Sequence, residues 1–188
     1  GWSFKQFLQQ LKAIPELTDD VVVLSDDEIM ALAGKKGIDP EGRFLPDTYF
    51  VPLSGNKSQI LIDASAAMDT ALAEAWAKRD ASLPLKSPDQ LLVLASIVEK
   101  ETGQAHERPE IAGVFVRRLQ KKMRLQTDPS VIYGMGDAYQ GNIRKQDLQR
   151  DTPYNTYMRT GLPPTPIAMP GRAALTASAH PAGGDDLY

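Results

Sequence analysis

Two glutamates, Glu99 and Glu101, are the residues whose type and spacing suggest acid–base chemistry. They end an apolar stretch with the spacing of a helix, and a turn of about 100° per residue places Leu94 and Val98 on its inner side. Glu101 falls in that apolar sector, whereas Glu99 falls on the outer side with Ser96. A carboxylic acid in apolar surroundings keeps its proton more easily, and general-acid catalysis requires the protonated form. Glu101 is therefore the candidate acid.

Helical geometry leaves a simpler alternative open for each glutamate. Glu101 lies near the expected helix end, where it would reach solvent or pair with Arg108. Glu99 would be an ordinary surface residue facing Lys100 or Lys121.

Composition excludes several other chemistries. The chain has 188 residues, 42% of them hydrophobic and 24% charged, which is typical of globular domains. A net charge of -3 without a long basic block argues against nucleic-acid binding. The chain has 0 Cys and only two His, so we expect no metal site and no cofactor. No apolar run reaches the roughly 20 residues of a membrane span, which predicts a soluble chain.

A second group of polar residues, Gln126, Thr127 and Asp128, suits sugar recognition. Asp128 is the candidate second carboxylate, and its alternative role is to cap a helix that begins at Pro129. Gln126 and Thr127 carry an amide and a hydroxyl that match sugar hydroxyls and N-acetyl groups, or that cap a turn.

Tyr154, Asn155 and Tyr157 offer aromatic faces for sugar rings and an amide for orientation. Core packing is the alternative for these residues. His106 and His180 are interpreted as surface and structural residues, without a catalytic role.

Apolar periodicity and capping residues predict the elements that would position these side chains. Ser87 before Pro88 marks one helix start, and two prolines between 82 and 88 mark a join near 84–87. The segment 42–51 is interpreted as a loop that runs into a β segment. Helices are predicted over 3–13, 26–33, 58–80, 88–102, 108–123 and 172–179, with a solvated basic face formed by Arg117, Arg118, Lys121 and Lys122.

The segment LASIVEKET at 94–102 closely resembles a motif of the YceG-like family, the endolytic murein transglycosylases. Further blocks of this family have similar counterparts here, in the same order. They are FLPDTY at 44–49, MRLQTDPSVIYG at 123–134, YNTY at 154–157, GLPP at 161–164 and AHP at 179–181.

The resemblance implies an enzyme that cuts glycan strands of bacterial peptidoglycan internally, between N-acetylmuramic acid and N-acetylglucosamine. The product would carry a 1,6-anhydro-muramyl end. Glu101 would be the catalytic residue, because the pair Glu101–Thr102 resembles the Glu-Ser pair of lysozyme-like transglycosylases. Gln126, Thr127, Asp128, Tyr154, Asn155 and Tyr157 would bind substrate.

The resemblance also implies a location and partners. Family members are held on the periplasmic side of the inner membrane by an N-terminal helix, which this sequence does not include. The partners would be glycan strands, with peptidoglycan synthases as further candidates and no nucleic acid.

We therefore expect an α+β fold, with a smaller mixed α/β domain at 1–85 that helps to wall the glycan cleft. A mostly helical, lysozyme-like catalytic domain would occupy 86–188. Two alternatives stay open. One is a muramidase that uses water and takes Asp128 as a true second carboxylate. The other is a non-catalytic peptidoglycan-binding module that scaffolds wall synthesis.

Overall fold

A computed structural model describes residues 1–188 as a helical protein. None of its helices combines the length and hydropathy needed to cross a membrane. The elements in chain order are α1 (Phe4–Lys12), α2 (Asp26–Leu32), α3 (Lys57–Ala77), α4 (Pro88–Glu101), α5 (Arg108–Gln120), α6 (Asp128–Met135), the short 3₁₀-helix η1 (Gly136–Ala138), α7 (Lys145–Gln149) and α8 (Arg172–Ala179).

The expected α+β class is wrong, because the chain forms no sheet and its N-terminal part is not a mixed α/β domain. The predicted β segment at 42–51 is irregular. The N–H of Leu45 donates to the carbonyl of Ala64 in α3, so a helix takes the bond that a neighbouring strand would have taken. Pro46 has no N–H to donate, and Phe50 is 94% exposed. The nearest approach to a sheet is a single parallel bridge between Thr18 and Asn56.

The six predicted helices are confirmed to within a few residues, because local signals set their ends. Ser3 and Ser25 each accept an N–H from the third helical residue, whose side chain bonds back to the cap. Ser87 caps α4 at Gln90, with Pro88 in the first turn. Short α7 was not predicted, since five residues carry no clear periodicity.

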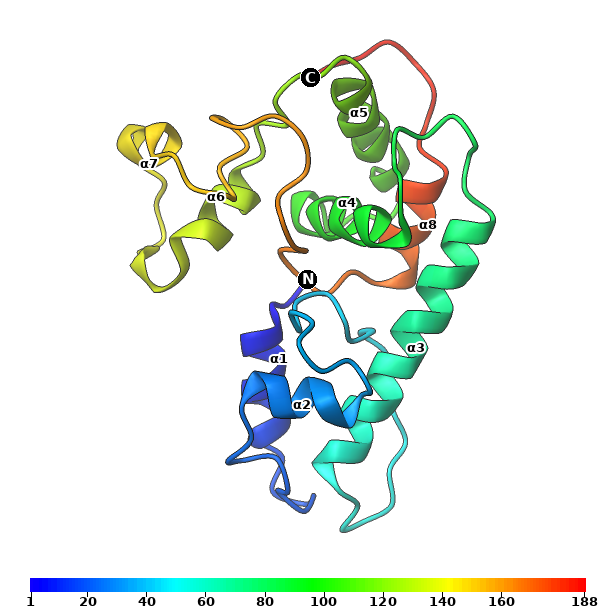
Figure 1. The fold of residues 1–188 in the computed structure, drawn as a ribbon, viewed down its shortest axis with the longest axis vertical. Helices are drawn as coiled ribbons and strands as arrows, with labels where there is room; N and C mark the ends of the chain where they lie inside the picture. The colour runs from blue at the N-terminus through cyan, green and yellow to red at the C-terminus, as the bar shows by residue number, and fades with distance from the viewer.

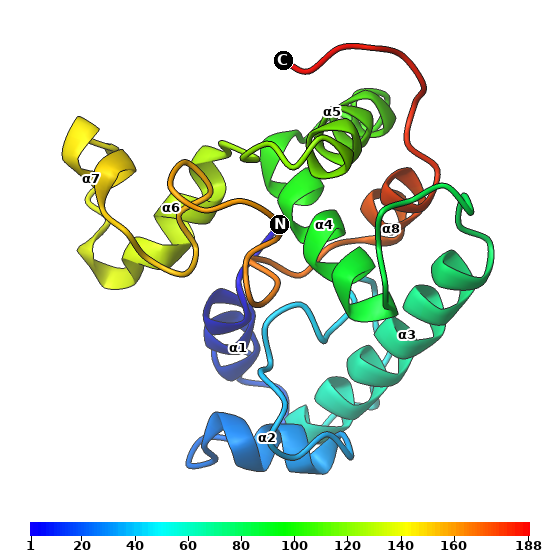
Figure 2. The ribbon, with the colours of Figure 1, turned by 45° about the horizontal axis from the view of Figure 1, so that its top comes forward.

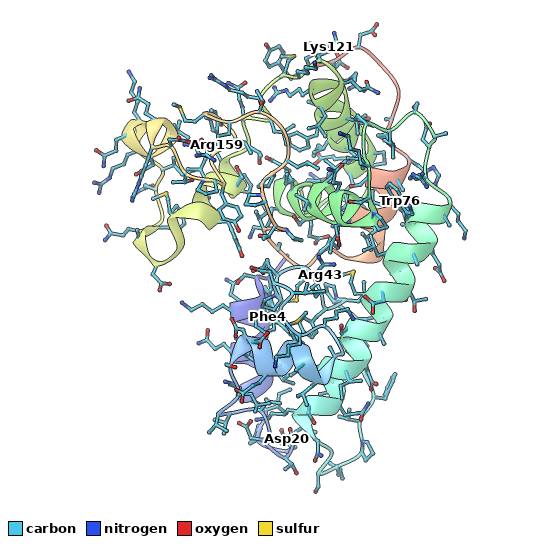
Figure 3. All side chains as sticks on the ribbon, viewed as in Figure 1. Phe4, Asp20, Arg43, Trp76, Lys121 and Arg159 are labelled. Atoms are coloured by element: carbon cyan, nitrogen blue, oxygen red, sulfur yellow. The ribbon has the colours of Figure 1, made fainter.

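Helix α3 connects two apolar cores and runs along one side of the molecule (Figure 1). Its first half, including Leu61 and Ala64, packs with α1 and α2. Its second half, including Met68 and Leu72, packs against α4 and α8, in a core that α5 also joins. Arg43 lies between the two cores (Figure 3), and its guanidinium donates to the Asp89 carboxylate at 2.8 Å.

Helix α4 lies at the centre and is buried on every side from Leu91 to Val98. Even Ser96, which the helical projection placed outside, is fully buried. Its hydroxyl donates to the Val93 carbonyl at 2.7 Å and accepts the N–H of Ile167 at 3.0 Å. Helices α5 and α1 lie on opposite sides of α4, while α6 lies beside its C-terminal end (Figure 2). Helix α4 is thus buried along most of its length but ends at an exposed residue.

One carboxylate, Glu41, is buried between α1 and α6. Only 5% of this residue is exposed, and its Oε1 accepts the N–H of Phe4 at 2.9 Å, at the start of α1. Burial raises the pKa of the Glu41 carboxyl from 4.5 to about 7, although the N–H of Phe4 and the hydroxyl of Tyr133 favour the charged form. Nearby Asp39 also raises this pKa.

A pH-dependent stability follows from Glu41. Its folded-state pKa of about 7 exceeds the unfolded value near 4.5, so its contribution to stability is fully present below pH ~4.5 and is lost as the pH rises through ~7. In Glu41→Gln this loss should disappear, while the amide oxygen still accepts the N–H of Phe4. The free energy of unfolding is measured with urea at pH ~5 and ~8.5. Between the lower and the higher pH, that of Glu41→Gln should rise by about 1–3 kcal/mol relative to that of the unchanged protein. A difference that does not change with pH would contradict this assignment.

Candidate active site

Glu101 is the last residue of α4, and its side chain is exposed. The expectation that it projects into the apolar sector is therefore wrong. The helix ends here because Thr102 adopts an extended backbone, with φ -144 and ψ 140. The carboxylate leaves the protein interior at this point, which makes it accessible to a ligand.

One hydroxyl fixes the Glu101 carboxylate. Thr127 Oγ1 donates a hydrogen bond to Glu101 Oε1. Thr127 is 1% exposed, and its own backbone is held by the hydroxyls of two other residues. Its N–H donates to Thr156 Oγ1 at 3.0 Å, and its carbonyl accepts Ser130 Oγ at 2.8 Å. A buried network thus positions the threonine that contacts Glu101.

The two residues beside Thr127 are exposed around Glu101. Gln126 has a left-handed backbone, with φ 52, and its N–H donates to the carbonyl of Thr156 at 3.1 Å. Asp128 is the first residue of α6, whose N-cap position is taken by Thr127. It makes no capping bond and instead accepts the hydroxyl of Tyr157 at 2.6 Å. The capping alternative for Asp128 is therefore wrong.

Tyr157 lies within the electrostatic reach of both carboxylates. Burial raises the pKa of the Tyr157 hydroxyl to about 12, and the Asp128 and Glu101 carboxylates contribute to the rise. Tyr157 therefore stays a neutral hydrogen-bond donor at physiological pH. The structure brings five of the predicted residues together, namely Glu101, Gln126, Thr127, Asp128 and Tyr157.

Tyr154 and Asn155 make internal contacts instead. Asn155 is 1% exposed; its Nδ2 donates to three backbone carbonyls at the end of α7, and its Oδ1 accepts the N–H of Tyr157. The Tyr154 ring packs against the Tyr133 ring, with the ring centroids 5.0 Å apart, and the Tyr154 hydroxyl is hydrogen-bonded to Thr165 Oγ1. Both residues thus hold the segment that carries Tyr157.

Arg118 lies near the candidate site, although no pattern in the sequence indicated it. It was assigned to a solvated basic face, yet it is 6% exposed and donates to the carbonyls of Leu125 and Leu187. It also lowers the pKa of Tyr157, against the larger effect of burial. A groove of ≈ 590 Å³ contains Glu101, Gln126 and Arg118 in its lining, and we call it the Arg118 groove.

Glu99 has a different environment from Glu101. Its Oε2 accepts the N–H of Gly171 at 3.2 Å, and Arg108 lies 3.8 Å from its Oε1. Its side chain is 15% exposed. The expected pairing with Lys100 or Lys121 is absent, and Glu99 anchors the start of α8.

An accessible carboxylate, a hydroxyl that orients it and a groove with a partly polar lining form an arrangement typical of a general acid–base enzyme acting on a polar, extended substrate. The chain belongs to the YceG-like family, whose sequence model matches residues 1–188.

Named relatives agree with this membership. The chain is 38% identical over 148 residues to an endolytic murein transglycosylase of Bacillus subtilis, with 79% of this chain and 41% of that protein covered. It is 33% identical over 153 residues to an endolytic murein transglycosylase of Streptococcus pneumoniae, with 79% of this chain and 27% of that protein covered. The chain thus spans less than half the length of these curated relatives.

A solved structure shows a similar fold. The crystal structure of a YceG-like protein from Listeria monocytogenes has a TM-score of 0.68 and is 34% identical to this chain. The match covers 97% of this chain and 57% of that one. The helical arrangement described above is therefore also found in a crystal structure of the family.

Proposed function

We propose that this chain cleaves the glycan strands of peptidoglycan as an endolytic transglycosylase, with Glu101 as both acid and base. The observation that carries the proposal is the accessible carboxylate at the end of buried α4, with Thr127 fixing one of its oxygens. The relatives named endolytic murein transglycosylases support the choice of substrate.

One carboxyl group suffices for this reaction. Glu101 would protonate the oxygen of the β-1,4 bond between N-acetylmuramic acid and N-acetylglucosamine. The bond from the muramyl C1 to this oxygen would break, and N-acetylglucosamine would leave with a free 4-hydroxyl. The resulting carboxylate would then take the proton of the muramyl C6 hydroxyl as its oxygen bonds to C1. The product is a 1,6-anhydro ring, and Glu101 regains its proton. The nucleophile is part of the substrate, so it is already in position.

The neighbouring residues would take distinct roles. Thr127 would hold the orientation of Glu101, while Gln126, Asp128 and Tyr157 would hydrogen-bond sugar hydroxyls and acetamido groups. Tyr154 and Asn155 would act indirectly, by holding the Tyr157 segment. In the cell, the chain would work on the periplasmic side of the inner membrane, with peptidoglycan synthases as candidate partners.

The mass of the products tests the reaction. Isolated sacculi are digested with this chain, and the released glycan ends are weighed. Anhydro ends weigh one water less than reducing ends, and an internal cut releases long fragments early. Reducing ends would indicate a muramidase. Glycan binding without any cleavage would support a non-catalytic module.

The muramidase alternative draws support from one observation, the exposed Asp128 carboxylate beside Thr127. In a two-carboxylate hydrolase, Asp128 would be essential. Under our proposal, Asp128→Asn keeps an oxygen that accepts the Tyr157 hydroxyl, so activity should fall only about two- to tenfold. The rate of anhydro-end formation measures this effect. A loss as complete as that of Glu101→Gln, in a folded protein, would favour the hydrolase.

A further inference from the structure

A second groove, of ≈ 620 Å³, lies between α1 and α6, and Glu41 is part of its lining. We call it the Glu41 groove. Lys100 and Pro129 also line it, and these residues directly precede Glu101 and follow Asp128 in the chain. The Glu41 groove is therefore lined in part by the chain neighbours of two residues of the proposed site.

The two grooves lie on opposite sides of the end of α4. The Arg118 groove is lined from α5, and the Glu41 groove is lined from α1. Figures 1 and 2 both place α5 and α1 on opposite sides of α4. Their volumes, ≈ 590 and ≈ 620 Å³, are similar, and each lies in the range of about 300–1,000 Å³ that holds a small organic ligand.

The lining of the Glu41 groove suits a sugar. Helix α1 contributes Gln9 and also Gln6, whose amide oxygen accepts the N–H of Ser3, and α6 contributes Ile132 and Tyr133. Amides and hydroxyls match sugar hydroxyls and N-acetyl groups, while apolar side chains match the C–H faces of the ring.

A buried polar group adds to this evidence. Glu41 is 95% buried and is one of the residues that line the groove, beside the start of α1. Its Oε1 accepts the N–H of Phe4. Such a fixed carboxyl group can hydrogen-bond a ligand hydroxyl or acetamido N–H without further ordering.

We propose that the Glu41 groove is a second arm of the glycan-binding cleft. It holds N-acetylhexosamine units on one side of the cut bond, and the Arg118 groove holds those on the other side. This inference rests on the proposed function and adds a structural reason for internal cleavage. A strand that occupies arms on both sides of Glu101 is cut away from its ends.

Two residues that line the Glu41 groove form an ion pair. Lys5 Nζ on α1 lies 2.8 Å from the Asp137 carboxylate in η1, and both side chains are largely exposed. An exposed pair of this kind contributes little to stability. An incoming strand therefore displaces it at small cost.

Two neighbouring glutamines on α1 provide a matched test. Both are exposed, but Gln9 lines the groove and Gln10 does not. In Gln9→Trp the indole should fill the groove, while Gln10→Trp adds the same bulk outside it. On glycan strands freed of peptides, Gln9→Trp should shift the products from internal fragments to short pieces released at strand ends. Gln10→Trp should match the unchanged chain.

A binding measurement separates this inference from the proposed function. In a Glu101→Gln background, calorimetry compares the dimer and the hexamer of β-1,4-linked N-acetylglucosamine. Gln9→Trp should weaken hexamer binding about fivefold or more, with little change for the dimer, which can still bind in the Arg118 groove. Equal hexamer affinities in Gln9→Trp and Gln10→Trp would overturn the second arm, whether or not the chain cuts strands. Absence of cleavage by the unchanged chain would overturn the proposed function instead.

Discussion

Glu101→Gln should reduce glycan cleavage by between about a hundredfold and ten-thousandfold, because an amide cannot deliver the proton that the leaving oxygen needs. The change nearly preserves shape, and the exposed side chain supports no core contact. Its amide oxygen still accepts the Thr127 hydroxyl. The fold and the affinity for glycan should therefore be retained. Release of anhydro ends from sacculi measures the rate, and thermal unfolding checks the fold.

Glu99→Gln is the matched control for this change, two residues away on the same helix. Its amide oxygen can still accept the N–H of Gly171, which the carboxylate accepts at 3.2 Å. We expect a small effect on cleavage, with a modest loss of stability from the weakened contact to Arg108. If Glu101→Gln stayed active and Glu99→Gln became inactive, the assignment of the acid to Glu101 would be wrong.

Thr127→Val should lower kcat by about tenfold to a hundredfold and change KM little, because misplacing a catalytic group by about 1 Å costs this much. Valine has nearly the shape of threonine but lacks the hydroxyl that bonds Glu101 Oε1. The bonds to Thr156 and Ser130 use the backbone of residue 127 and survive the change. The effect should therefore fall on the orientation of Glu101.

Thr127→Ser is the rescue variant, since it restores the hydroxyl. It should recover most of the lost kcat, whereas a purely structural role of the methyl group predicts that serine is the worse substitution. Steady-state kinetics of both variants on peptide-free glycan strands distinguishes these outcomes. Equal kcat values for Thr127→Val and the unchanged chain would contradict the proposed role of Thr127 in orienting Glu101.

Local signals in the sequence predicted the helices well. Ser3 and Ser25 form capping boxes, and Ser87 with Pro88 starts α4, so these helix ends depend on neighbours a few residues away. The strand expected within 42–51 failed for the opposite reason. A strand needs a partner, and here the N–H of Leu45 bonds to α3 instead.

The proposed site was only partly predictable for the same reason. The helical projection singled out Glu101, but its premise of burial was wrong because α4 ends at that residue and releases the side chain to solvent. The burial of Arg118 depends on contacts with Leu125 and the C-terminal segment, and that of Glu41 on the start of α1. No periodicity in the sequence reveals such long-range contacts.

The use of water distinguishes transglycosylation from hydrolysis most directly. Peptide-free glycan strands are digested with the chain in water enriched in heavy oxygen, and the new muramyl ends are weighed. Closure of the ring by the C6 hydroxyl predicts anhydro ends that carry no heavy oxygen, with the reaction lost in Glu101→Gln. Reducing ends that carry one heavy oxygen each would contradict the proposed reaction and would identify water as the nucleophile.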